Sequence, residues 1–211
     1  MEKGNWEQIQ LKLHDDLKII FRDYDIKNLK DYEKRRIVFE YLSNNVTYDF
    51  ELLEAIRDFH VSQKSVSRDS YLELENVIYE KKGICNGISQ YYKLLLGELG
   101  IKSFCVICDD GTPVKHQLTL VYDEDKDTYS FDDVVSVIVG RGTLDDFFDY
   151  DLPTANAFNQ GNKKISGDKY WFILPDSFIN FLIGRNGADP INLEQLPDNI
   201  SSVKDGGSFK F

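Results

Sequence analysis

The chain has 211 residues, of which 42% are hydrophobic and 13% aromatic, so it can bury a core and is too apolar to be disordered throughout. Its formal net charge of -11 argues against a nucleic-acid partner and against an anionic membrane, because both attract clustered Lys and Arg. No apolar leader or membrane-length stretch is visible, and the three cysteines are an odd number. A cytoplasmic protein with reduced thiols is therefore expected, although export without a leader would leave the same pattern.

The first half of the chain is predicted to be mainly helical. Apolar residues recur three or four positions apart in several segments, as they do on one face of a helix. These segments are 6–24, 31–45, about 50–60 and about 70–80. A polar, Ser-rich loop is expected at 61–70. The strongest helical pattern follows Cys85 and closes at Gly100, a residue suited to a helix C-cap.

The second half is predicted to contain strands. Three strand-like runs cover 102–108, 116–123 and 128–139, and the acidic turns between them predict antiparallel pairing. Further expectations are a short helix at 143–149, a strand at 169–174 and a helix from Pro175. Helices followed by antiparallel strands indicate the α+β class. The expected domains are a helical extension (1–30), the main domain (31–184) and a polar, loosely packed tail (185–211).

Cys85 lies at the predicted start of the long helix, two residues after Gly83. The helix dipole and the N–H groups of a first turn favour an anion there, which would favour the thiolate and stabilise an oxyanion. Gly83 and Gly87 would permit close approach of a substrate backbone. Cys85 is therefore a candidate nucleophile, and the alternative is a small core residue.

His116 and Asp132 are the candidate partners of Cys85. His116 is the sole histidine after Cys85 and opens a predicted strand, where an ordinary surface histidine is the alternative. A hairpin with its turn centred near 124–125 places Asp132 opposite His116, so that a base and an orienting carboxylate lie side by side. Asp133 is the other candidate, because neighbouring strand residues point to opposite faces and only one of the two can contact His116.

Other patterns favour structural roles. Cys105 and Cys108 form a C-x-x-C in a predicted strand, where they point to opposite faces, and no second pair of zinc ligands follows. The acidic run 123–127 lacks the ligand spacing of an EF-hand and is typical of a turn. No metal or cofactor is expected.

The residues around Cys85 read Gly83-Ile84-Cys85-Asn86-Gly87, and their helix ends in Leu99-Gly100-Ile101. Together with His116 on one strand and Asp132 on the next, this order resembles the bacterial transglutaminase-like superfamily. The resemblance covers roughly residues 33–180. It implies a papain-like α+β core with the nucleophile helix packed on an antiparallel sheet, as in cysteine peptidases, transglutaminases and peptide N-glycanases.

Three positions depart from the superfamily's pattern. Gln117-Leu118 replaces its Ala-Trp, Asp133-Val134 replaces Pro-Thr or Val-Thr, and Asn86 replaces an aromatic residue. The resulting prediction is a thiol-dependent acyl-transfer enzyme with a protein or peptide substrate, in which Cys85 attacks an amide, His116 moves the proton and Asp132 orients the imidazole. Hydrolysis is favoured over transamidation because it needs no second binding site. The alternative is a non-enzymatic interaction module that retains the fold.

Overall fold

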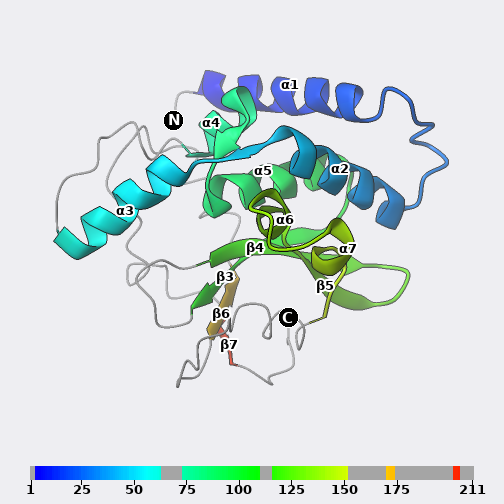
Figure 1. The fold of residues 1–211 in the computed structure, drawn as a ribbon. Coiled ribbons are helices and arrows are strands. Elements are labelled where there is room, and N and C mark those ends of the chain that lie inside the picture. Colours follow the sequence, from blue (N-terminus) through cyan, green and yellow to red (C-terminus); the bar gives the residue numbers. More distant parts are fainter. Residues whose placement is uncertain (1–2, 63–72, 110–115, 152–169, 174–201, 205–211) are drawn as a thin grey trace.

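The computed structural model describes residues 3–62, 73–109, 116–151, 170–173 and 202–204. Its helices are α1 (Lys3–Ile20), α2 (Asp31–Asn45), α3 (Phe50–Ser62), α4 (Glu73–Glu80), α5 (Cys85–Glu98), α6 (Val134–Ile138) and α7 (Leu144–Phe147). Its strands are β1 (Thr47–Tyr48), β2 (Lys82–Gly83), β3 (Ser103–Asp109), β4 (His116–Asp123), β5 (Thr128–Asp132), β6 (Tyr170–Ile173) and β7 (Ser202–Lys204). The α+β class predicted from the sequence is confirmed (Figure 1).

Five strands form one antiparallel sheet with the order β5-β4-β3-β6-β7. The predicted antiparallel pairing of the three central runs is confirmed, since Cys105 pairs with Thr119 and Thr119 pairs with Asp132. β1 and β2 form a separate, short parallel pair. This pair brings the chain that follows α2 alongside the residues that precede Cys85.

Helix α5 is the centre of the molecule. It packs on β3 and β4 of the sheet, and α1, α2 and α4 cover its other side (Figure 1). Because α5 is enclosed from both sides, even its polar residues Ser89 and Gln90 are buried together with Tyr91 and Tyr92. A helix in this position holds its first residue, Cys85, at a fixed point relative to the sheet.

Gly100 ends α5, as the sequence predicts. Its φ of 78° lies in the left-handed region, and Ile101 N–H donates to the Leu96 carbonyl at 2.9 Å while Gly100 N–H donates to the Gly97 carbonyl at 3.0 Å. These two bonds form a Schellman motif, which satisfies carbonyls that the end of a helix leaves unpaired. The motif turns the chain directly into β3.

Helix α1 belongs to the same hydrophobic core as the rest of the described chain, because Ile9 and Leu13 are fully buried in it. Asp16 is also buried, and it accepts hydrogen bonds from Lys81 Nζ at 2.9 Å and Tyr91 Oη at 2.6 Å. These bonds satisfy a carboxylate that would be costly to bury alone. They fasten α1 to α5 and to the segment before β2.

The structure departs from the predictions in the second half of the chain. The run 128–139 was expected to be one strand, but β5 ends at Asp132 and α6 begins at Val134. Asp133 caps α6 by accepting from Ser136 N–H, a local bond that overrides the strand preference of the valines. β7 lies within the tail that was expected to be loosely packed. Residues 61 and 62 of the expected Ser-rich loop belong to α3, and the rest of that loop and the helix from Pro175 lie outside the described residues.

Candidate functional site

The site begins at the N-terminus of α5, directly after strand β2, which pairs with β1. Thr47 N–H donates to the Lys81 carbonyl and Asp49 N–H donates to the Gly83 carbonyl, both at 2.8 Å. Lys81 has a φ of 55°, so the chain turns sharply just before β2. Cys85 is then the first residue of the helix, as expected, and 7% of its surface is exposed.

Polar contacts join the first turns of α5 to the start of β4. Gln117 Nε2 donates to the Asn86 carbonyl at 3.2 Å, and Ser89 Oγ donates to the Gln117 carbonyl at 3.0 Å. Thr119 Oγ1 adds a longer bond of 3.4 Å to the Ser89 carbonyl. Because His116 immediately precedes Gln117, these bonds determine where the imidazole lies relative to Cys85.

His116 lies between a thiol and a carboxylate. Its Nε2 is 2.8 Å from Asp133 Oδ2, and a hydrogen bond with the Cys85 side chain contributes to the pKa of the ring. With Nε2 directed at Asp133, the ring nitrogen left to face Cys85 is Nδ1. The structure thus brings the side chains of Cys85, His116 and Asp133 together.

The pKa values show which protonation states the arrangement favours. Burial lowers the pKa of His116, but the charge of Asp133 and hydrogen bonds to Asp133 and Cys85 raise it to about 10. Burial raises the pKa of Asp133, but the charge of His116 and hydrogen bonds from His116 and Ser136 lower it below its ordinary 3.8. An imidazolium paired with a carboxylate is therefore the stable form near neutral pH.

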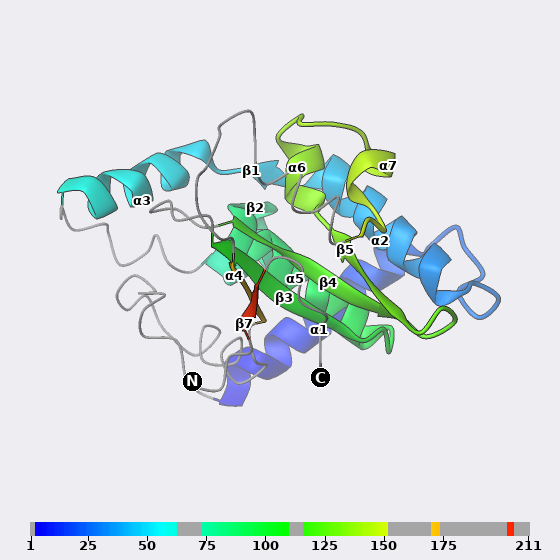
Figure 2. The same cartoon turned by 90° about the horizontal axis from the view of Figure 1, so that it is seen from below.

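The backbone around Asp133 is anchored by α7 and the chain that follows it. Asp133 N–H donates to the Phe147 carbonyl at 2.9 Å, and Phe131 and Tyr150 exchange two backbone bonds of 2.8 and 3.1 Å. β1, β2 and α6 lie together near the start of α5 (Figure 2). Elements from three parts of the chain therefore converge on the site.

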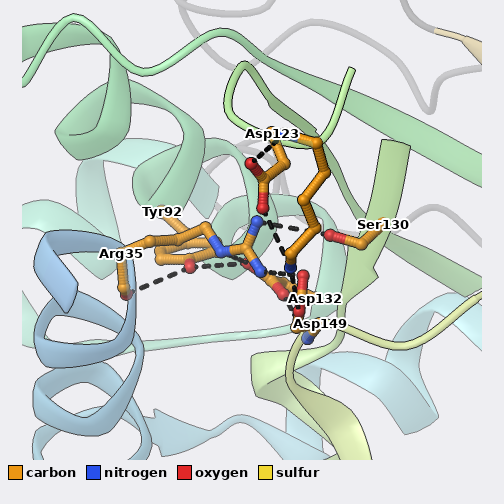
Figure 3. Close-up of polar contacts among 7 residues, drawn as sticks. Arg35, Tyr92, Asp123, Ser130, Asp132 and Asp149 are labelled. Atoms are coloured by element: carbon orange, nitrogen blue, oxygen red, sulfur yellow. Dashed lines mark hydrogen bonds and ion pairs between the residues drawn. The ribbon is translucent and has the colours of Figure 1, made fainter. Parts of the chain in front are cut away.

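Asp132, which was predicted to orient His116, faces a different set of residues. Its Oδ2 accepts from Tyr92 Oη at 2.8 Å and lies 3.2 Å from Arg35 Nε, and its Oδ1 accepts from Asp149 N–H at 2.9 Å (Figure 3). The predicted contact with His116 is therefore wrong. Asp133, the alternative at that position, occupies the place beside the imidazole.

The register of the β4–β5 hairpin explains the correction. Asp123 pairs with Thr128, so the turn is centred between Asp125 and Lys126, one residue or more beyond the position assumed from the sequence. Asp132 is consequently opposite Thr119, and both side chains point toward α5. There Asp132 accepts a hydrogen bond from Tyr92. The shift moves Asp132 three residues along β4 from His116.

Arg35 is the centre of the cluster that holds Asp132. It is buried, it donates to Asp149 and, at 3.2 Å, to Ser130 Oγ, and its guanidinium lies 4.6 Å from the ring centroid of Phe148. Two carboxylates balance its charge, which a buried arginine requires. The Arg35 cluster (Arg35, Tyr92, Ser130, Asp132 and Asp149) fixes the end of β5 next to the site (Figure 3).

A pocket of about 330 Å³ lies beside Arg35, and Tyr32, Tyr122 and Asp123 also line it. Asp123 ends β4 and His116 begins it, so the pocket is at the opposite end of the strand from the imidazole. Among the described residues that line it, there is no cysteine or histidine. The pocket is therefore separate from Cys85 and His116.

Within the part of the chain that the structure describes, no group of His, Cys, Asp and Glu side chains is arranged to hold a metal ion. Cys105 is fully buried in the core, in accord with the packing role expected for it. The described helices also include none that is long and apolar enough to cross a membrane.

Comparison with solved structures shows a match to a crystal structure of a TGase, with a TM-score of 0.53 and 20% sequence identity. The match covers 68% of this chain and 35% of the TGase chain, so this chain spans about a third of that protein's length. The fold is transglutaminase-like. No family model and no curated protein matches the sequence.

The sequence contained a signal for Asp133 that spacing alone did not resolve. An Asp followed three residues later by Ser136 fits an N-cap whose carboxylate accepts from the N3 backbone, which marks a helix start within the apparent strand. The Arg35 cluster had no such signal, because its members lie up to 114 positions apart in the chain.

Proposed function

We propose that this protein is a thiol-dependent acyl-transfer enzyme that acts on amide bonds of proteins or peptides. The observation that carries the proposal is the chain of contacts from the Cys85 thiol through the His116 imidazole to the Asp133 carboxylate. The transglutaminase-like fold supports it, because such an arrangement at the start of a central helix is typical of thiol catalysis. Asp133 takes the orienting role that the sequence had suggested for Asp132.

The proposed reaction starts from a Cys85 thiolate beside a His116 imidazolium. The thiolate attacks the amide carbonyl, and the backbone N–H of Cys85 stabilises the oxyanion at the helix N-terminus. His116 gives its Nδ1 proton to the leaving amine as the C–N bond breaks, which leaves a thioester on Cys85. A water molecule loses a proton to His116 and adds to the thioester, and collapse of the intermediate breaks the C–S bond, which releases the acid and restores the Cys85 thiolate beside the His116 imidazolium.

Asp133 keeps the imidazole in the orientation that these reaction steps require. A carboxylate bound to Nε2–H holds Nδ1 toward Cys85 and stabilises the imidazolium that exists before and between the proton transfers. Hydrolysis is proposed over transamidation because it requires no second binding site for an amine. The resolving nucleophile is then water.

The test is site-resolved alkylation of Cys85 with iodoacetamide at pH 7, followed by mass spectrometry. The same Cys85 peptide in denatured protein supplies the rate of an unperturbed cysteine, and Cys85 in the native protein is expected to react at least tenfold faster. His116→Ala should remove this advantage, whereas His14→Ala, which changes a histidine paired with Glu98 on another face, should preserve it.

A thiol-reactive peptide probe extends the test to catalysis. Wild-type protein should label at Cys85, and both Cys85→Ala and His116→Ala should abolish labelling. If native Cys85 reacts no faster than the denatured peptide, the protein is not a thiol enzyme, and the interaction module motivated by the altered neighbours of His116 and Asp132 becomes the better account.

A further inference from the structure

The Asp133 carboxylate receives more support than a contact with His116 alone requires. Ser136 Oγ donates to Asp133 Oδ2 at 2.7 Å, and Ser136 N–H donates to Oδ1 at 3.1 Å. Oδ2 therefore accepts from two side chains, since His116 Nε2 lies 2.8 Å from the same atom. Ser136 itself is buried, with 1% of its surface exposed.

Each contact of Ser136 removes one freedom of the carboxylate. The bond to Oδ1 is the N-cap bond of α6, so it places the Asp133 side chain at the helix start. The bond to Oδ2 prevents rotation about the bond between Cβ and Cγ, which would otherwise let the two oxygens exchange partners. Because the serine hydroxyl donates its one proton to Oδ2, one lone pair of that atom is occupied and the other is left to accept from the imidazole.

We propose that Ser136 is a positioning residue that acts through Asp133, orienting the carboxylate so that His116 keeps its Nδ1 directed at Cys85. The proposal rests on the proposed function for its catalytic consequence, but the orientation of His116 can be measured without any turnover. Ser136 contacts the carboxylate that meets His116, whereas the neighbouring Arg35 cluster holds the end of β5 through Asp132.

The matched variants are Ser136→Ala, Ser136→Thr and Ser130→Ala. Ser136→Ala removes the side-chain bond to Oδ2 and retains the backbone bond, so the helix cap survives. Ser136→Thr restores the hydroxyl. Ser130→Ala deletes another buried serine hydroxyl from the adjacent strand, one that contacts Arg35 and not Asp133, and it reports the effect of losing a buried bond in general.

The first readout is the imidazole ¹⁵N spectrum of His116, assigned by its loss in His116→Gln. In Ser136→Ala the Nε2–H resonance should broaden or shift and the titration midpoint of His116 should fall, whereas Ser136→Thr and Ser130→Ala should resemble the wild type. The second readout is the Cys85 alkylation rate at pH 7, which should fall roughly threefold to tenfold in Ser136→Ala, as expected for the net contribution of one typical hydrogen bond.

An unchanged His116 titration in a folded Ser136→Ala protein would overturn the positioning role, as would an equal change in Ser130→Ala. If Ser136→Ala fails to fold, a Ser136→Thr protein with a displaced Nε2–H resonance and a slower alkylation rate overturns it, and one that matches the wild type supports it. Failure of the proposed function has a different signature, because wild-type Cys85 would then lack enhanced reactivity while the spectrum of His116 still responded to Ser136.

Discussion

Replacing Asp133 by Asn should show which of the two consecutive aspartates sets the pKa of His116. The charge centres of a pair in contact at 2.8 Å are roughly 4 Å apart, which at an effective dielectric constant of about 20 corresponds to about 4 kcal/mol. This is about 3 pKa units. Because burial of His116 opposes its charge, the pKa of His116 should fall from about 10 to about 7 or below in Asp133→Asn.

The pH dependence of stability should change in the same variant. The pKa of His116 is raised above its ordinary 6.5, so its contribution to stability is fully present below about 6.5 and is lost as the pH rises through about 10. The pKa of Asp133 is lowered below 3.8, so its contribution is present above 3.8 and is lost as the pH falls through the lowered value. The stability difference between wild type and Asp133→Asn should therefore be largest between pH 3.8 and 6.5.

Asp132→Asn is the matched control. It leaves the buried Arg35 with one carboxylate partner instead of two, so the free energy of unfolding should fall by about 3 kcal/mol, the lower end of the range for a broken buried pair. The titration of His116, followed by NMR, should stay within about half a pKa unit of the wild type. If His116 responds to Asp132→Asn and not to Asp133→Asn, the assignment of Asp133 is refuted.

Other parts of the molecule provide three further predictions. Gly100→Ala should lower the free energy of unfolding by about 1–2 kcal/mol in denaturant titration through backbone strain, because an added Cβ meets no atom within 4 Å. Tyr91→Phe should lower the free energy of unfolding by about 1–3 kcal/mol by removing a donor from buried Asp16, and an unchanged free energy of unfolding would contradict this. Gln117→Leu removes the donor to the Asn86 carbonyl and should slow alkylation of Cys85 roughly threefold, with unchanged circular dichroism.

The elements that could be predicted from the sequence are those whose signals are local. The stripe of 31–45 and the helix closed by Gly100 were predicted with nearly the observed bounds, and His116–Asp123 was predicted to the residue, because periodicity and turn residues lie within a few positions of each other. Cys85 at a helix start is equally local, since a glycine-flanked cysteine precedes the strongest apolar repeat.

The identity of the third site residue depended on information that is not local. The register of β4 and β5 places Asp132 away from His116, and register is set by turn geometry and by burial of one face. The aspartate that faces α5 is the one that Tyr92 and Arg35 can satisfy there. Those two partners lie 40 and 97 positions before it in the chain, so the pairing becomes visible only after the helices have packed on the sheet.

The turn between β4 and β5 has a consequence for how this protein tolerates insertions and deletions. It lies about 25 Å along the strand from His116, in an exposed acidic loop of the kind in which length usually varies freely. Here a gain or loss of one residue that shifted β5 against β4 by one position would turn each β5 side chain to the other face, so that Asp132 would no longer face Tyr92 and Arg35. The length of this surface loop is therefore linked to the thiol site. Among related proteins, loop length should correlate with the presence of Cys85 and His116 more closely than the identity of the loop residues does.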